Sequence, residues 1–221
     1  MSVAFKICGL TSREAVDATV EAGAAMAGFM FFPRSPRHLE LEVAADLAGA
    51  LPAGVASVAV TVNADDALID AIVGTVRPSY LQAHGQESPE RIGEIAARSG
   101  LPVIKVLPVS TAEDLSAADA YADVADRILF DAKPPKGATR PGGLGAAFDW
   151  TLLSGYRGRL PWILSGGLDA GNVAEALRVT GARAVDLSSG VERELGVKDP
   201  GLIHAFADAL RQGDHARRER A

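Results

Sequence analysis

The chain has 221 residues, of which 48% are hydrophobic, 23% charged and 5% aromatic, and 22 basic against 28 acidic side chains give a formal net charge of −6. This length can bury one substantial core, and the negative charge argues against a general nucleic-acid-binding surface. A single cysteine cannot form an internal disulfide, and no apolar stretch approaches the ~20 residues of a membrane span. We therefore expect one cytoplasmic domain over residues 1–221, with no nucleic-acid or membrane partner.

Short β-branched runs alternate eight times with longer segments of helical periodicity. The expected strands are 3–8, 27–31, 56–62, 79–83, 102–107, 126–130, 160–164 and 183–187. The expected helices begin near Ser12, Leu41, Asp65, Ser88, Thr111, Asp149, Gly171 and Asp199, with Ser12, Ser88 and Thr111 as helix N-caps. Eight such units predict a (β/α)8 TIM barrel. A doubly wound open sheet is the alternative, but no Gly-x-Gly-x-x-Gly follows the first strand.

Cys8 lies at the carboxyl end of the first expected strand, where the chain breaks into a glycine turn. Catalytic groups of parallel α/β proteins collect at that end, and a thiolate can act as nucleophile or proton acceptor. The alternative is a small buried hydrophobic residue. Lys6 shares a strand face with Cys8, so its ammonium would favour the thiolate if that face points inward. Alternatively, Lys6 extends to the barrel floor.

Arg37, after the second expected strand, and His84, after the fourth, are two further candidate site residues. Arg37 has a planar guanidinium that suits a carboxylate, although an arginine on a loop is more often a solvated surface charge. His84 follows the fourth strand and is expected on the same rim.

Asp131 follows the apolar end of the sixth strand and opens a long loop rich in proline, glycine and cationic residues. Partial burial would let such a carboxyl donate a proton, whereas a helix or turn cap is the structural alternative. The loop, residues 131–148, is expected to be a mobile cover over the site rather than plain disorder.

Glycine-rich turns follow the seventh and eighth strands, and barrels often bind phosphate at this pair of loops. The candidate phosphate-binding residues are Gly143, Gly145, Gly167, Ser188, Ser189 and Gly190. Asp186 shares a face with Ser188 and is expected either to bind substrate hydroxyls or to pair with a neighbouring lysine. The four histidines have no metal-ligand spacing, so no metal site is expected. The polar residues 214–221 are expected to be a frayed helix end.

Over nearly its whole length the sequence resembles the phosphoribosylanthranilate isomerase family. The matching segments are residues 6–9 (Lys-Ile-Cys-Gly), 28–29 with 35–37, 82–85 (Gln-Ala-His-Gly), 130–131, 142–145 with 148–150, 165–168 (Ser-Gly-Gly-Leu) and 185–192. The resemblance implies a cofactor-free Amadori rearrangement of N-(5-phosphoribosyl)anthranilate in tryptophan biosynthesis. It also implies a small-molecule phosphoribosyl substrate, and we expect a monomer or homodimer.

Carried over by position, Cys8 resembles the family's general base and Asp131 its general acid. Arg37 resembles the residue that faces the anthranilate carboxylate, and the glycine-rich turns would hold the phosphate. The sequence departs from the family at Leu144, where a threonine or serine is usual, and at Ala83, where a larger apolar residue is usual. The first difference removes a hydroxyl contact from the loop, and the second affects packing.

Three other functions compete with this interpretation. The histidine-pathway isomerase performs the same rearrangement but places an aspartate where Cys8 stands, and no second pair of phosphate loops follows strands three and four. Indole-glycerol-phosphate synthase would need a catalytic lysine and a longer amino terminus. A non-catalytic phosphosugar-binding barrel would tolerate the loss of both Cys8 and Asp131, whose joint presence argues against it.

Overall fold

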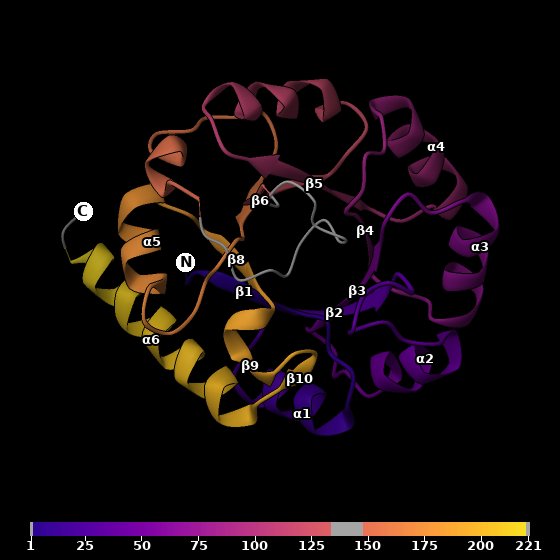
Figure 1. Cartoon of the computed structure of the whole chain (residues 1–221), viewed down its shortest axis with the longest axis horizontal. Coiled ribbons are helices and arrows are strands. Elements are labelled where there is room, and N and C mark those ends of the chain that lie inside the picture. Colours follow the sequence, from indigo (N-terminus) through magenta and orange to yellow (C-terminus); the bar gives the residue numbers. More distant parts are fainter. Residues whose placement is uncertain (1, 134–147, 220–221) are drawn as a thin grey trace.

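The computed structural model describes residues 2–133 and 148–219. Eight parallel strands form a closed barrel in which each strand pairs with its neighbours in sequence and β1 pairs with β8. Viewed along the barrel, the helices form a ring outside the strands (Figure 1). The predicted (β/α)8 barrel is thus confirmed, and the open doubly wound sheet is wrong.

The barrel strands agree with the expected segments to within one or two residues at most ends. They are β1 (Ala4–Cys8), β2 (Met26–Phe31), β3 (Ala56–Thr61), β4 (Tyr80–Ala83), β5 (Val103–Val109), β6 (Arg127–Ala132), β7 (Trp162–Leu164) and β8 (Ala184–Leu187). Because β6 continues through Ala132, Asp131 is the second-last residue of this strand and does not belong to the loop.

In the part of the chain that the structure describes, six α-helices cover the outside of the barrel. They are α1 (Arg13–Glu21), α2 (Leu41–Gly49), α3 (Asp66–Thr75), α4 (Pro89–Ser99), α5 (Val173–Thr180) and α6 (Pro200–Arg218). Two expected N-caps are confirmed, because the side chain of Ser12 accepts a hydrogen bond from the Ala15 N–H and that of Ser88 accepts one from the Arg91 N–H.

After β5 and β6 the expected helices are short 3₁₀ helices, η1 (Glu113–Tyr121) and η2 (Trp150–Leu153). In η1 the side chains turned toward the core recur every third residue, at Leu115, Ala118 and Tyr121, which suits three residues per turn. Thr111 is not a side-chain cap as predicted. The Asp114 carboxylate instead accepts hydrogen bonds from the Ser110 and Thr111 N–H groups.

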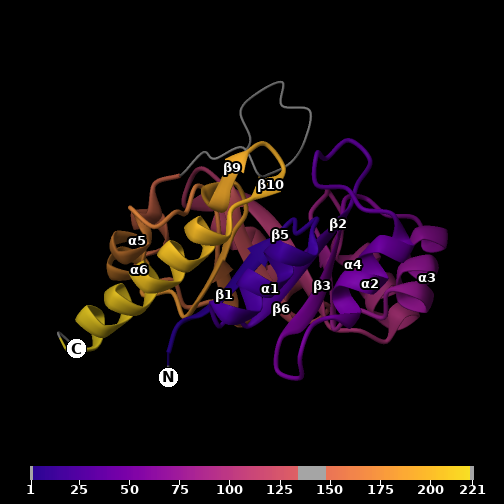
Figure 2. The ribbon, with the colours of Figure 1, turned by 90° about the horizontal axis from the view of Figure 1, so that it is seen from below.

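A small antiparallel pair, β9 (Glu192–Glu194) and β10 (Val197–Lys198), follows the 3₁₀ turn η3 (Ser189–Val191) and was not expected from the sequence. Figure 2 shows β9 and β10 at one end of the barrel, with the start of β1 and the end of α6 toward the other. The pair therefore lies at the rim formed by the carboxyl ends of the barrel strands.

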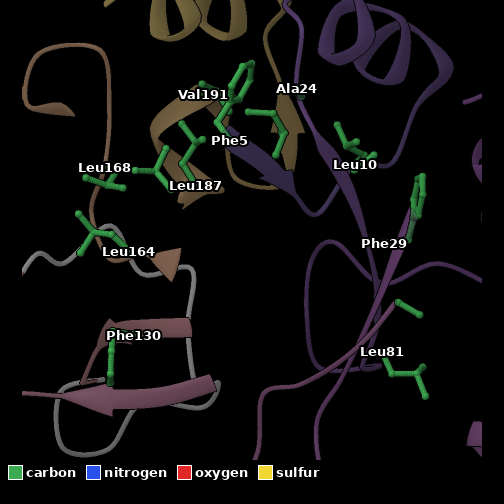
Figure 3. Close-up of a cluster of buried hydrophobic side chains, with 14 of the residues drawn as sticks. Phe5, Leu10, Ala24, Phe29, Leu81, Phe130, Leu164, Leu168, Leu187 and Val191 are labelled. Atoms are coloured by element: carbon green, nitrogen blue, oxygen red, sulfur yellow. The ribbon is translucent and has the colours of Figure 1, made fainter. Parts of the chain in front are cut away.

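The strands separate two apolar layers. The outer layer packs between the strands and the helices. Figure 3 shows part of this layer and labels Phe5, Phe29 and Phe130 among others. The inner layer fills the barrel and contains Cys8, Val58, Val60, Ile104, Val106, Leu129 and Ile163. Since strand residues alternate between the two layers, Cys8 faces inward.

The expected frayed end from residue 214 onward is wrong for residues 214–218, which continue α6. Asp214 is buried, and its carboxylate accepts a hydrogen bond from the Val3 N–H and pairs with Arg217 and Arg218. This interaction joins the two ends of the chain. No helix in residues 2–133 or 148–219 is long and apolar enough to span a membrane.

Candidate active site

Cys8 lies at the last position of β1 and is only 6% exposed. Below it on the same face, Lys6 is 1% exposed, and its Nζ lies 2.7 Å from Asp186 Oδ1 on β8. Gly28 provides the space for this lysine, because a Cβ there would lie 3.1 Å from Lys6 Nζ. The expectation that Asp186 pairs with a lysine is confirmed, and the alternative that Lys6 extends to the barrel floor is wrong.

The charges around Cys8 oppose one another. Burial raises the pKa of the Cys8 thiol above its ordinary value, Lys6 and Lys198 act to lower it, and Asp186 adds to the rise. Lys6 therefore favours the thiolate as predicted, but it does not overcome the cost of burial. For Lys6, burial acts to lower the pKa, yet the charges of Asp186 and Cys8 outweigh it and raise the pKa overall.

Asp131 and His84 meet across the rim. His84 Nε2 lies 3.3 Å from Asp131 Oδ2, and both side chains are largely buried. Asp131 Oδ1 accepts a hydrogen bond of 2.9 Å from the Ala132 N–H. Gly166, at φ +91°, gives the carboxylate room, since a Cβ there would lie 3.3 Å from Oδ1 and 2.8 Å from the Ala132 nitrogen. The sequence placed both residues on the rim but did not predict that they are neighbours.

Arg37 is not a solvated surface charge, because it is 3% exposed. Its Nε and Nη2 donate to the two carboxylate oxygens of Glu192 on β9, at 2.6 and 2.8 Å. Gly9, at φ +77°, leaves room for the Arg37 side chain to pass over its backbone, because a Cβ at this position would lie 2.4 Å from Arg37 Cδ. Glu192 therefore fixes the orientation of the guanidinium, and the carboxylate-binding role of Arg37 stays a prediction.

The glycine-rich turns after β7 and β8 lie against each other. A Cβ on Gly190 would lie 2.0 Å from the Leu168 carbonyl oxygen, so only glycine fits at this contact. Gly167, at φ +66°, lies in the first turn, and Ser188 and Ser189 lie in the second. The two turns meet as the phosphate-site hypothesis requires. The other two candidates, Gly143 and Gly145, and most of the expected cover lie outside the described residues.

Sequence reasoning missed Lys198, whose side chain is fully buried on β10. Its Nζ donates to Glu192 Oε1 at 2.6 Å and to the backbone oxygen and Oγ of Ser188, each at 3.0 Å. Glu192 and Lys198 flank a Leu-Gly turn just after the serine pair, but strands of three and two residues give no periodic signal. Arg37, Glu192 and Lys198 thus form a cation–anion–cation triad.

A second buried ion pair, also missed, supports the loop that carries His84. Lys105 Nζ lies 2.6 Å from Glu87 Oε2 and donates to the Gly85 carbonyl at 2.8 Å. Glu87 in turn accepts hydrogen bonds from the Gly85 and Asn63 N–H groups. Burial acts to raise the pKa of Glu87, but Lys105 and these N–H groups lower it overall. The network holds the chain directly after His84.

Gln82, two residues before His84 on the inward face of β4, is fully buried. Neither amide atom has a hydrogen-bond partner among residues 2–133 and 148–219. In the same ranges there is no group of three or more His, Cys, Asp or Glu side chains arranged to hold a metal ion.

Glu192 should make the stability of the protein acid-sensitive. Burial acts to raise its pKa, but Arg37 and Lys198 outweigh this and lower the pKa from 4.5 to about 2. Glu192 is therefore protonated more readily in the unfolded chain than in the folded protein. As the pH is lowered from about 4.5 to about 2, the free energy of unfolding should decrease by about 3 kcal/mol. Urea denaturation across this range checks the loss. The Glu192→Gln variant should lack this component, and an equally steep loss in that variant would contradict it.

Comparisons with known proteins agree with one another. The family model for N-(5'-phosphoribosyl)anthranilate (PRA) isomerase matches residues 5–209. An isomerase of that name from Rhodopseudomonas palustris is 59% identical over 211 residues, covering 96% of this chain and 99% of the relative. One from Bradyrhizobium diazoefficiens is 53% identical over 219 residues, covering 99% and 98%.

Solved structures give the same result. The phosphoribosylanthranilate isomerase of Thermotoga maritima superposes with a TM-score of 0.84 at 37% identity, covering 95% of this chain and 99% of that one. A second structure, of such an isomerase in complex with reduced 1-(o-carboxyphenylamino)-1-deoxyribulose 5-phosphate, gives 0.82 at 36% identity with the same coverage. Matches of this extent in sequence and in structure establish that the chain belongs to the phosphoribosylanthranilate isomerase family.

Proposed function

We propose that the protein catalyses the Amadori rearrangement of N-(5-phosphoribosyl)anthranilate to 1-(2-carboxyphenylamino)-1-deoxyribulose 5-phosphate in tryptophan biosynthesis, with Cys8 as general base and Asp131 as general acid. The isomerase activity follows from the family. The observation that supports the two roles is that a thiol and a carboxyl project from the carboxyl ends of β1 and β6 into one rim.

In the first step Asp131 donates its proton to the furanose ring oxygen. The bond between that oxygen and the anomeric carbon breaks, and the anthranilate nitrogen supplies the electron pair that forms an iminium. His84 Nε2, which makes no hydrogen bond within the described residues, lies 3.3 Å from the Asp131 carboxylate and would interact with it once the acid has given up its proton. The proton that Asp131 loses ends on the new sugar hydroxyl.

In the second step the Cys8 thiolate removes the proton from carbon 2 of the sugar. The electrons of the C–H bond form a double bond between carbons 1 and 2, and the iminium nitrogen takes back its electron pair. The adjacent iminium makes this C–H acidic, so a thiolate is a sufficient base. The enolamine that results gains a proton at carbon 1 and loses one from its hydroxyl to give the ketone.

The two anionic ends of the substrate need separate sites. The phosphate would bind the backbone of the turns at Gly167 and at residues 188–190, together with Gly143 and Gly145, which lie outside the described residues. The anthranilate carboxylate would face Arg37. Asp186, held by Lys6 and by the Ser165 hydroxyl, would contact a sugar hydroxyl.

Loss of Arg37 should affect both substrate binding and stability. The Arg37→Ala variant should raise KM more than it lowers kcat, because the carboxylate loses its partner. It should also lose about 1.5–3 kcal/mol of stability, because Glu192 loses two hydrogen bonds from Arg37 but keeps its ion pair with Lys198. Steady-state kinetics and urea denaturation separate the two effects. Arg37→Lys, which keeps a charge near Glu192, is the milder comparison, and an unchanged KM in Arg37→Ala would exclude the carboxylate role.

The activity itself is tested by following the fluorescence of freshly prepared phosphoribosylanthranilate. Wild-type protein should convert it to the deoxyribulose phosphate faster than the spontaneous decay of the substrate. The Cys8→Ala/Asp131→Asn double variant should leave only the spontaneous rate. Binding without conversion by the wild-type protein would instead favour a non-catalytic phosphosugar-binding barrel.

A further inference from the structure

Lys198 is a buried lysine whose three N–H groups are all used. Its acceptors are Glu192 Oε1, the Ser188 carbonyl and the Ser188 hydroxyl oxygen, at 2.6 to 3.0 Å. A lysine this deeply buried is costly unless paired, so its position is tightly specified. Neither the family match nor the relatives' names assign it a role.

A hydrogen-bond chain joins Lys198 to Cys8. The Ser188 hydroxyl donates its single proton to the Cys8 carbonyl at 2.9 Å, so the same oxygen must accept from Lys198. Lys198 therefore fixes the rotamer of Ser188, and Ser188 in turn holds the backbone of the thiol-bearing residue. Both contacts lie at the carboxyl end of the barrel.

Among residues 2–133 and 148–219, five charged side chains near Cys8 carry three positive and two negative charges. Lys6 on β1 pairs with Asp186 on β8, and Arg37 pairs with Glu192 on β9, so each of these pairs is neutral. Lys198 on β10 shares Glu192 with Arg37 and is the one additional charge of this group of five. His84, which follows β4, and Asp131, on β6, are two further titratable groups of the rim and contact each other.

Removing Lys198 would leave this group neutral. A thiolate at Cys8 would then keep only Lys6, whose charge Asp186 partly offsets, so burial would disfavour the anion more strongly. Consistent with this, burial lowers the pKa of Lys198 to about 8, whereas Glu192 and Cys8 act to raise it. At neutral pH the lysine is therefore largely charged, whereas above about pH 8 it is largely neutral, so its charge acts on Cys8 near neutral pH.

We propose that Lys198 is a positioning residue of the active site, which holds Ser188 against the Cys8 carbonyl and supplies the positive charge that the anionic form of Cys8 requires. The inference rests on the proposed function only in giving Cys8 the role of base. A structural lysine would stabilise the β9–β10 segment without changing the ionisation of the thiol.

The ionisation of Cys8 can be measured directly, because it is the only cysteine in the chain. The rate at which a small alkylating reagent modifies Cys8 at pH 7, where Lys198 is charged, reports the thiolate fraction, with Cys8→Ala as the blank. Lys198→Gln, which keeps hydrogen-bonding capacity but not the charge, should slow this rate roughly tenfold, the loss of thiolate that a rise of about one unit in the thiol pKa causes at pH 7. The value of kcat/KM at pH 7 should fall with it.

Lys105→Gln is the matched control, because Lys105 is equally buried and paired but lies outside the barrel lumen, with Glu87. It should lose stability without slowing the alkylation of Cys8 at pH 7. An unchanged alkylation rate in folded Lys198→Gln, or an equal fall in Lys105→Gln, would overturn the proposal.

Lys198→Arg provides the test if Lys198→Gln does not fold. Arginine keeps the positive charge, so the alkylation rate of Cys8 at pH 7 should stay at or above the wild-type value. A rate roughly tenfold lower would show that charge is not what matters, and would overturn the proposal. Because alkylation does not use turnover, it can fail while Cys8→Ala still abolishes activity. It can equally succeed if Cys8 proves not to be the base.

Discussion

Replacing Cys8 by alanine is expected to reduce turnover at least ~100-fold, the scale at which a general base contributes. The thiol is the only group at the end of β1 that can accept the proton, since Lys6 is engaged by Asp186 below it. Removing one buried sulfur from the inner apolar layer should cost only about 1 kcal/mol of stability. Steady-state kinetics and a thermal melt measure the two effects independently.

Cys8→Ser is the matched variant for this residue, because it keeps the size of the side chain and replaces the thiol with a group that hardly ionises near neutral pH. It should be as inactive as the alanine variant. If either variant folds and turns over substrate at near wild-type rate, Cys8 is not the base.

The Asp131→Asn variant is expected to lose a similar factor, at least ~100-fold, because an amide cannot donate an acidic proton to the ring oxygen. The substitution keeps the shape of the side chain, and its amide oxygen can still accept the Ala132 N–H. The loss should appear in kcat more than in KM, since the roles proposed for substrate binding lie elsewhere.

Asp126→Asn is the control on the same side of the barrel. Asp126 directly precedes β6, at the opposite end from Asp131, and its carboxylate accepts the Val103 N–H at 2.7 Å. It should keep activity within about twofold, as exposed substitutions usually do. If Asp126→Asn lost as much activity as Asp131→Asn, the loss would follow from a disturbed strand β6 and not from a missing general acid.

The strands and the residues at their carboxyl ends could be predicted because both depend on local pattern. Cys8 and Asp131 each follow a short apolar run, and a closed parallel barrel places such positions on one rim. The starts of the α-helices after Ser12 and Ser88 could also be predicted, because a side-chain cap binds a backbone N–H only three residues away. The 3₁₀ helix η1 was not, because its spacing of buried residues differs from an α-helix by less than one residue per turn.

The contacts that organise the site could not be predicted because they join distant parts of the chain. Lys6 and Asp186 are 180 positions apart, and Arg37 and Glu192 are 155 apart. Arg37 could be named as a candidate for binding a carboxylate, with a surface charge as the alternative, but nothing near it in sequence reveals its partner Glu192. Lys198 went unnoticed because its importance comes from β9–β10, a pair of strands too short for a periodic signal.

The central claim is that the Cys8 sulfur and the Asp131 carboxyl act on the same sugar. A crystal structure of this protein with reduced 1-(o-carboxyphenylamino)-1-deoxyribulose 5-phosphate tests it most directly. The account predicts Cys8 Sγ within about 3.5 Å of carbon 2 and an Asp131 oxygen within about 3.2 Å of the hydroxyl derived from the ring oxygen. A sugar bound beyond reach of either group, with its phosphate away from the turns after β7 and β8, would contradict it.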